Sequence, residues 1–74
     1  MQEINVEKIL HIIKSIREEF GYSQAEMAKR TGISTSFYGM LERGNRCLSV
    51  EHLIKISNAL DCNITDILNI AENN

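Results

Sequence analysis

The chain has 74 residues, no proline, an apolar fraction of 43% and a formal net charge of −2 at pH 7. A chain this short forms one domain, residues 1–74, and buries only about 60% of the surface of its unfolded form, which leaves little volume for an enclosed active site. Because β-branched and aromatic residues do not alternate with polar ones, the composition predicts an all-α fold.

The first predicted helix covers Val6–Phe20. Asn5 is suited to cap its start, and Gly21 ends it, since glycine accepts the left-handed backbone that closes many helices. The buried face is predicted from apolar residues that recur at helical spacing, namely Ile9, Ile12, Ile13, Ile16 and Phe20.

Residues 23–43 predict two short helices joined by a tight turn. Ser23 caps the first of them, with Glu26 completing a capping box, and this helix continues to Thr31. Gly32 ends it, and Ser34 caps a further helix that runs to Arg43. This is the pattern of a helix-turn-helix, whose second helix enters the major groove of DNA.

The two faces of this helix pair differ in character. The inner face is predicted to contain Met27, Ala28, Ile33, Tyr38 and Leu41. The outward face of the helix from Ser34 is predicted to contain Ser34, Thr35, Ser36, Gly39, Met40 and Arg43. Gly39 has no side chain, so we expect it to allow close approach of a DNA backbone or base.

Two more helices complete the predicted five-helix domain. A fourth, capped by Ser49, runs from Val50 to Leu60 with a core face of Val50, Leu53, Ile56, Ser57 and Leu60, and Ile54 beside it. A short fifth helix, capped by Asn63, contributes Ile64, Ile67, Leu68 and Ile70. These apolar residues either close the small core or also form a dimer contact. Residues 71–74 are predicted to be a frayed tail.

Positive charge is concentrated in the middle of the chain. Residues 29–46 contain four basic side chains (Lys29, Arg30, Arg43 and Arg46) and only one acidic side chain, Glu42. The segments on either side carry a net negative charge. A nucleic-acid surface is therefore expected in and just after the helix-turn-helix, despite the acidic total.

The candidate DNA contacts fall into two groups. Ser34, Thr35 and Ser36 offer hydroxyls to bases or phosphates, and Met40 offers an apolar contact one turn later. The alternatives are a helix cap, which we favour for Ser34, or solvated surface. Gln24 at the start of its helix, and Arg43, Asn45 and Arg46 after the next one, are candidate phosphate contacts.

Arg17 and Glu42 are interpreted as a structural ion pair. Both lie on helices among core residues, so a bidentate pair between them would join the first helix to the third. We expect this pair to orient the helix that reads DNA.

No catalytic constellation, metal site, cofactor motif or small-molecule site is evident, so the chain is not expected to be an enzyme. Cys47 and Cys62 match no zinc spacing, and His11 and His52 have no ligand companions nearby. Reduced cysteines, with no signal peptide and no membrane-length apolar run, predict a cytoplasmic protein without a membrane partner.

The chain closely resembles the lambda-repressor-like (Cro/XRE-type) helix-turn-helix family. The resemblance is carried by IREEFGYSQAEMAKRTGIS (16–34), LERGNR (41–46) and SVEHLIKISNALDCNITDIL (49–68). It implies a compact five-helix domain in which Gln24 holds a phosphate, and Thr35, Ser36 and Met40 lie on the base side. It further implies that Arg43, Asn45 and Arg46 lie near the phosphate backbone of the DNA. Arg17 and Glu42 would form the buried ion pair. The departures are Gly39–Met40 in the reading face, Tyr38 at a site more often aliphatic, and Cys47–Leu48 in the following loop.

The expected function is sequence-specific regulation of transcription. The resemblance implies a repressor-type protein that binds a palindromic double-stranded DNA operator as a homodimer, with the dimer contacts expected in the fourth and fifth helices or the acidic tail. The alternative is a protein-interaction module of the same fold, an antitoxin or co-regulator with weak or no base readout. The negative net charge and Met40 favour this alternative.

Overall fold

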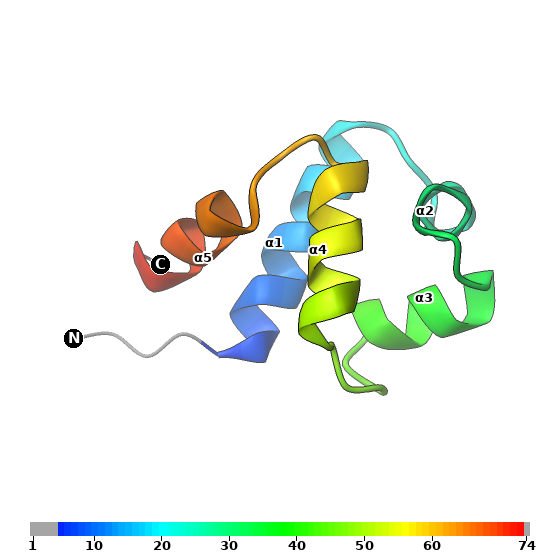
Figure 1. Ribbon diagram of the computed structural model, residues 1–74, viewed down its shortest axis with the longest axis horizontal. Helices are drawn as coiled ribbons and strands as arrows, with labels where there is room; N and C mark the ends of the chain where they lie inside the picture. Colours follow the sequence, from blue (N-terminus) through cyan, green and yellow to red (C-terminus); the bar gives the residue numbers. More distant parts are fainter. Residues whose placement is uncertain (1–4, 74) are drawn as a thin grey trace.

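The computed structural model describes residues 5–73, and within that range it contains five α-helices and no β-strand. They are α1 (Val6–Glu19), α2 (Gln24–Thr31), α3 (Thr35–Glu42), α4 (Val50–Ala59) and α5 (Ile64–Asn73). Figure 1 shows α1 and α4 in the middle of the molecule, with α2 and α3 on one side and α5 on the other. The predicted all-α fold of five helices is confirmed.

Four of the five helices begin at a side-chain cap. The side-chain oxygens of Asn5, Ser23, Ser34 and Ser49 each accept a hydrogen bond from a backbone N–H three residues later, at 2.9–3.1 Å. Each bond satisfies one of the N–H groups that a helix start leaves without a partner. The capping box expected at Ser23 is only half formed, because the Glu26 carboxylate pairs with Arg30 instead, at 2.8 Å.

The tight turn between α2 and α3 depends on Gly32. Its φ of 74° and ψ of 22° place it in the left-handed region, where a Cβ would be strained. The N–H of Ile33 then donates to the carbonyl oxygen of Ala28 at 3.1 Å, which closes the end of α2. With Ser34 capping α3 directly afterwards, the two helices meet at a turn of only three residues, 32–34.

One core joins all five helices, and it fixes α3 from behind. Its members include Ile13 from α1, Met27 from α2, Tyr38 from α3, Ile56 from α4 and Ile67 from α5. Tyr38 and Met27 are both completely buried. Because the inner side of α3 is committed to this core, its opposite side is left for solvent or a ligand.

The predicted core face of α4 was wrong at its first residue. Val50 is 69% exposed, whereas Leu53, Ile56 and Leu60 are buried as expected. Phe20, predicted to extend the buried face of α1, is 45% exposed because α1 ends at Glu19 and Phe20 belongs to the turn that follows. Leu10 is buried although the spacing did not place it on the core face.

The frayed tail predicted for residues 71–74 was also wrong over its described part. Helix α5 continues to Asn73, and Ala71 is completely buried in the core. Residue 74 lies outside the described range. Ala71 follows Ile67 by four residues, so both lie on the same face of α5, and burial of this face holds the last turn in place.

Asp61 closes α4 with a strained backbone, and replacing it with glycine is expected to stabilise the protein. Its φ of 52° makes it the one non-glycine residue between positions 5 and 73 with a positive φ. Glycine avoids the clash of Cβ in this region, so Asp61→Gly should raise the free energy of unfolding by about 1 kcal/mol. For a domain of this size, that is a rise of roughly 4–8 °C in melting temperature.

The matched control Asp61→Ala removes the same carboxylate but keeps the Cβ. An equal rise for both variants would attribute the effect to charge rather than to backbone strain.

Candidate nucleic-acid interface

The start of α3 presents hydroxyl groups to solvent. Ser34, Thr35 and Ser36 are all exposed. The Ser34 hydroxyl accepts a hydrogen bond from the N–H of Phe37 at 3.1 Å, so it acts as the helix cap. No other described residue hydrogen-bonds to the hydroxyls of Thr35 or Ser36, which leaves both able to donate and accept. Such groups at the start of a groove-binding helix can reach phosphates or base edges.

Phe37 is part of this surface, although the sequence did not single it out. It is half-buried, and its ring centre lies 5.3 Å from that of His52 on α4. The Nδ1 atom of His52 is in turn hydrogen-bonded to the hydroxyl of Ser49, at 2.8 Å. The sequence could have indicated this position, because Phe37 is large and apolar but lies outside the buried stripe formed by Tyr38 and Leu41.

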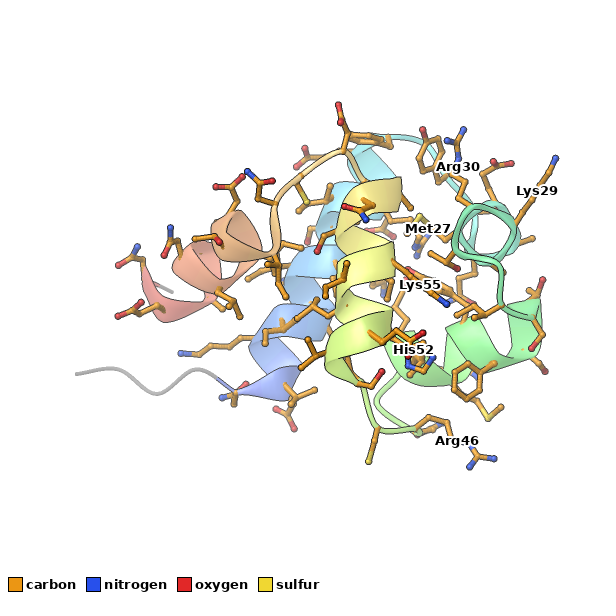
Figure 2. All side chains as sticks on the ribbon, viewed as in Figure 1. Met27, Lys29, Arg30, Arg46, His52 and Lys55 are labelled. Atoms are coloured by element: carbon orange, nitrogen blue, oxygen red, sulfur yellow. The ribbon has the colours of Figure 1, made fainter. Side chains whose placement is uncertain are left out.

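Three candidate phosphate contacts lie at the far end of α3. Arg43 closes α3, and Asn45 and Arg46 follow in the loop to α4; all three are exposed. In Figure 2, Arg46 projects away from the body of the protein at this loop. Met40, two residues before the end of α3, is half-buried.

The basic residues that cluster in the sequence do not form one patch. In Figure 2, Arg30 lies near the top of the view beside α2, Arg46 lies near the bottom at the loop after α3, and Lys29 projects outward from α2. The Nε atom of Arg30 pairs with Glu26 at 2.8 Å, and its guanidinium lies 4.2 Å from the centre of the Tyr22 ring. Arg30 therefore stabilises the turn between α1 and α2, and the free positive charge near α3 comes from Arg43 and Arg46.

Gln24 lies at the start of α2, where a phosphate contact was expected, but its side chain turns toward α3. Its Nε2 atom donates to the Glu42 carboxylate at 3.3 Å. Gly39, which was expected on the outward face, is buried. A Cβ added there would lie 3.0 Å from Gln24 Oε1 and 3.0 Å from Arg43 Nη1. These two side chains thus occupy the space over Gly39 that was expected to be open to DNA.

The structure brings Arg17 and Glu42 together in a bidentate pair. Arg17 Nε and Nη2 donate to the two carboxylate oxygens of Glu42, each at 2.9 Å. The remaining Arg17 nitrogen, Nη1, donates to the carbonyl oxygen of Tyr22 at 2.7 Å. Both charged residues are buried. The pair therefore ties the end of α1 to the end of α3, and with it the orientation of α3.

Tyr38 is an additional member of this buried network, and the sequence did not reveal its polar role. Its hydroxyl donates to Glu42 Oε2 at 2.7 Å. Glu42 thus accepts hydrogen bonds from Arg17, Tyr38 and Gln24, and no buried side-chain polar atom between residues 5 and 73 lacks a partner. The signal that could have suggested this bond is the spacing of four residues between Tyr38 and Glu42 on one helix.

The network shifts the titration of its members. Burial alone would raise the pKa of Glu42, but the hydrogen bonds from Arg17, Tyr38 and Gln24 outweigh it and hold that pKa below the ordinary 4.5. Burial, together with the hydrogen bond to Glu42, raises the pKa of Tyr38. The hydrogen bond to Glu42 also raises the pKa of Arg17, against the opposing effect of burial. The pair is therefore fully ionised at neutral pH.

Acid is expected to weaken the fold through Glu42. Because its pKa is lowered on folding, its ionisation stabilises the native state fully above the ordinary value of 4.5, and this contribution is lost as pH falls through the folded-state pKa. Urea midpoints measured from pH 7 to pH 3 should fall below about pH 4.5. The Glu42→Gln variant, which cannot ionise at this position, should be less stable at pH 7 and should approach the wild type at pH 3. Parallel curves for the two proteins would assign the acid sensitivity to other carboxylates.

Other kinds of site have less support in the described structure. Between residues 5 and 73, no three His, Cys, Asp or Glu side chains gather closely enough to hold a metal ion. Over the same range, no helix combines the length and apolar character that crossing a bilayer requires. Cys47 and Cys62 are not bonded to each other. Burial and the nearby Asp66 and Asp61 carboxylates raise the pKa of Cys62, which favours an unreactive thiol.

Comparisons with known proteins agree with this geometry. The helix-turn-helix family model HTH_3 matches residues 13–67, from α1 into α5. The HTH-type transcriptional regulator SinR of Bacillus licheniformis is 36% identical over 58 residues, which cover 77% of this chain and 52% of that protein. SinR of Bacillus subtilis (strain 168) is 35% identical over 57 residues, covering 76% and 51%. The chain thus spans about half the length of these curated relatives.

The structure is also similar to the crystal structure of the clp gene regulator ClgR from C. glutamicum. The two match with a TM-score of 0.81 at 27% sequence identity, over 95% of this chain and 91% of that one.

Proposed function

The chain belongs to the helix-turn-helix family, and on that premise we propose that it is a DNA-binding regulator of transcription whose α3 enters the major groove. The observation that carries the proposal is the two-sided character of α3. Tyr38, Leu41 and Glu42 bury one side, while Thr35 and Ser36 stand exposed on the other. Relatives named as transcriptional regulators support a non-enzymatic role, and the proposed role in transcription places the protein in the cytoplasm.

The proposed contacts divide between bases and backbone. Thr35, Ser36 and Met40 face the bases. The phosphate contacts are Ser34, Gln24, Arg43, Asn45 and Arg46. Hydroxyls and a methionine cannot form the bidentate base contacts that long amides or arginines provide. Specificity is therefore expected to depend more on phosphate placement, DNA shape and half-site spacing than on many direct base bonds.

We further propose that the protein acts as a homodimer on a palindromic operator, as a repressor. One domain covers only one half-site, and specific affinity normally needs two half-sites about one helical turn apart. The apolar residues of α5 mostly close the core, since Ile67 is fully buried and Ile64 and Leu68 pack against it. Among the exposed large apolar side chains, Val50 and Ile54 lie on α4 and Ile70 lies on α5. These residues are the proposed dimer contact. Sedimentation showing only monomer at tens of micromolar, about the range expected for weak self-association, would refute the dimer.

A protein-interaction module, an antitoxin or co-regulator of the same fold, is the second candidate. It is favoured by the net charge of −2 and by Arg30, whose charge is neutralised by Glu26. A DNA reader and such a module differ in their response to salt. Only the reader should lose affinity for duplexes steeply as salt rises, because contacts to phosphates release counterions.

Selection of bound duplexes from a random DNA pool tests the proposed function directly. The expected result is an enriched motif with two related half-sites whose centres are separated by about one helical turn. Recovery of unenriched, random sequences at low salt would leave the protein-interaction module as the better account.

A further inference from the structure

Gly39 differs from the other three glycines of the chain in what it contributes. Gly21, Gly32 and Gly44 have positive φ angles of 74°, 74° and 81°, which explains glycine at each of those positions. Gly39 lies within α3 and has ordinary helical backbone. Glycine is among the poorest helix formers, so its presence here needs a reason other than conformation.

The missing side chain at Gly39 makes room for two polar groups. Gln24 Oε1 and Arg43 Nη1 would both lie 3.0 Å from an added Cβ, at the lower limit of real Cβ contacts. The Gln24 amide has little freedom to withdraw, because its Nε2 atom is bonded to Glu42. Gly39 thus leaves room on this side of α3 for a side-chain end from the start of α2 and another from the end of α3.

The charges around Gly39 leave the Arg43 guanidinium free to bind an anion. Glu42 is the adjacent carboxylate, but Arg17 occupies both of its oxygens, and Tyr38 and Gln24 add further hydrogen bonds. No described carboxylate lies within ion-pair distance of Arg43. Arg43 is exposed, so its guanidinium can offer several donors to a phosphate oxygen.

We propose that Gly39 is a positioning residue: because it has no side chain, the Arg43 guanidinium can lie over α3 beside Gln24, where it holds one phosphate of the DNA backbone. The proposal rests on the DNA-binding function proposed above. It assigns to Gly39 an indirect role, in place of the direct approach of DNA to this glycine expected from the sequence.

The Gly39→Ala variant separates this role from a structural one. Its melting temperature should stay near that of the wild type, because alanine is the better helix former and the exposed Arg43 side chain can move aside. Its affinity for a selected operator and for random duplex should both fall roughly tenfold, about the effect of one charge-assisted hydrogen bond. The slope of log affinity against log salt should weaken by about 0.9, the value for one lost phosphate contact. The control is Asn58→Ala on the exposed side of α4, where affinity and slope should not change.

A double-mutant cycle with Arg43→Ala tests whether Gly39 acts through Arg43. In the Arg43→Ala protein, adding Gly39→Ala should lower affinity less than twofold further, because the displaced group is already absent. The proposal is overturned if Gly39→Ala binds with wild-type affinity and slope. It is also overturned if the tenfold loss persists in the Arg43→Ala protein, since the added methyl would then obstruct DNA directly. Failure of the wild type to bind any duplex would instead refute the proposed function, before either variant is compared.

Discussion

Replacing Glu42 with alanine is expected to lower the free energy of unfolding by about 3–5 kcal/mol, the range for breaking a buried ion pair by removing one partner. The change leaves the Arg17 guanidinium and the Tyr38 hydroxyl buried without the acceptor that both use. Small domains are only marginally stable, so a loss of this size removes much of the folded population. Urea or thermal unfolding monitored by circular dichroism measures it.

The control for Glu42→Ala is Glu19→Ala. Glu19 is exposed near the end of α1 and takes part in no ion pair with a described residue. Its replacement changes the net charge equally and should alter the free energy of unfolding by less than about 0.5 kcal/mol. If Glu42→Ala proved as mild as Glu19→Ala, the network could not be what fixes α3 against α1.

Replacing both Arg43 and Arg46 with alanine is expected to lower affinity for every duplex about a hundredfold near physiological salt, if each arginine contacts one phosphate. The slope of log affinity against log salt should weaken by about 1.8 for two lost contacts. The loss should be similar for selected and random sequences, because phosphate contacts carry no base information. Both side chains are exposed, so the melting temperature should change little.

A matched double variant guards against a general effect of charge. Lys8→Ala with Lys55→Ala also removes two positive charges, from α1 and α4 rather than from α3 and its loop; Lys55 is paired with Glu51 at 3.5 Å. Its affinity and salt slope should stay near those of the wild type. Equal losses in the two double variants would show that net charge, rather than the position of Arg43 and Arg46, controls binding.

The parts of the fold that were predicted correctly are set by short stretches of sequence. A serine or asparagine followed at the right spacing by apolar residues marks a helix start, and Asn5, Ser23, Ser34 and Ser49 all serve as caps. Gly32 ends α2 because few other residues adopt its left-handed backbone without strain. These features depend on hydrogen bonds between residues close in sequence, so they can be predicted from the sequence alone.

The sequence predictions were wrong where contacts between helices determine whether a residue is buried. Val50 matches the apolar stripe of α4 but begins the helix, where no other element covers it. Ala71 looks like part of a polar tail, yet the core buries it and thereby orders the last turn of α5. The tilt of a helix and the ends of its neighbours determine such contacts, and neither is visible in the periodicity of one segment.

Some features of the candidate DNA-binding site could likewise be predicted from the sequence, and others could not. The exposed hydroxyls of Thr35 and Ser36 follow from the helix pattern alone. The inward turn of Gln24, the burial of Gly39 and the pairing of Arg30 with Glu26 do not, because each depends on where a neighbouring side chain lies. Proximity in sequence suggested one basic patch, but the fold separates Arg30 from Arg46 (Figure 2).

The central claim is that α3 reads DNA sequence, and one comparison of affinities tests it most directly. The dissociation constant of the wild-type protein is measured at physiological salt for a duplex enriched by selection, and for a scrambled duplex of the same composition. The account predicts that the selected duplex binds at least about a thousandfold more tightly, the lower end for specific DNA-binding proteins. Equal affinities for the two duplexes would contradict it.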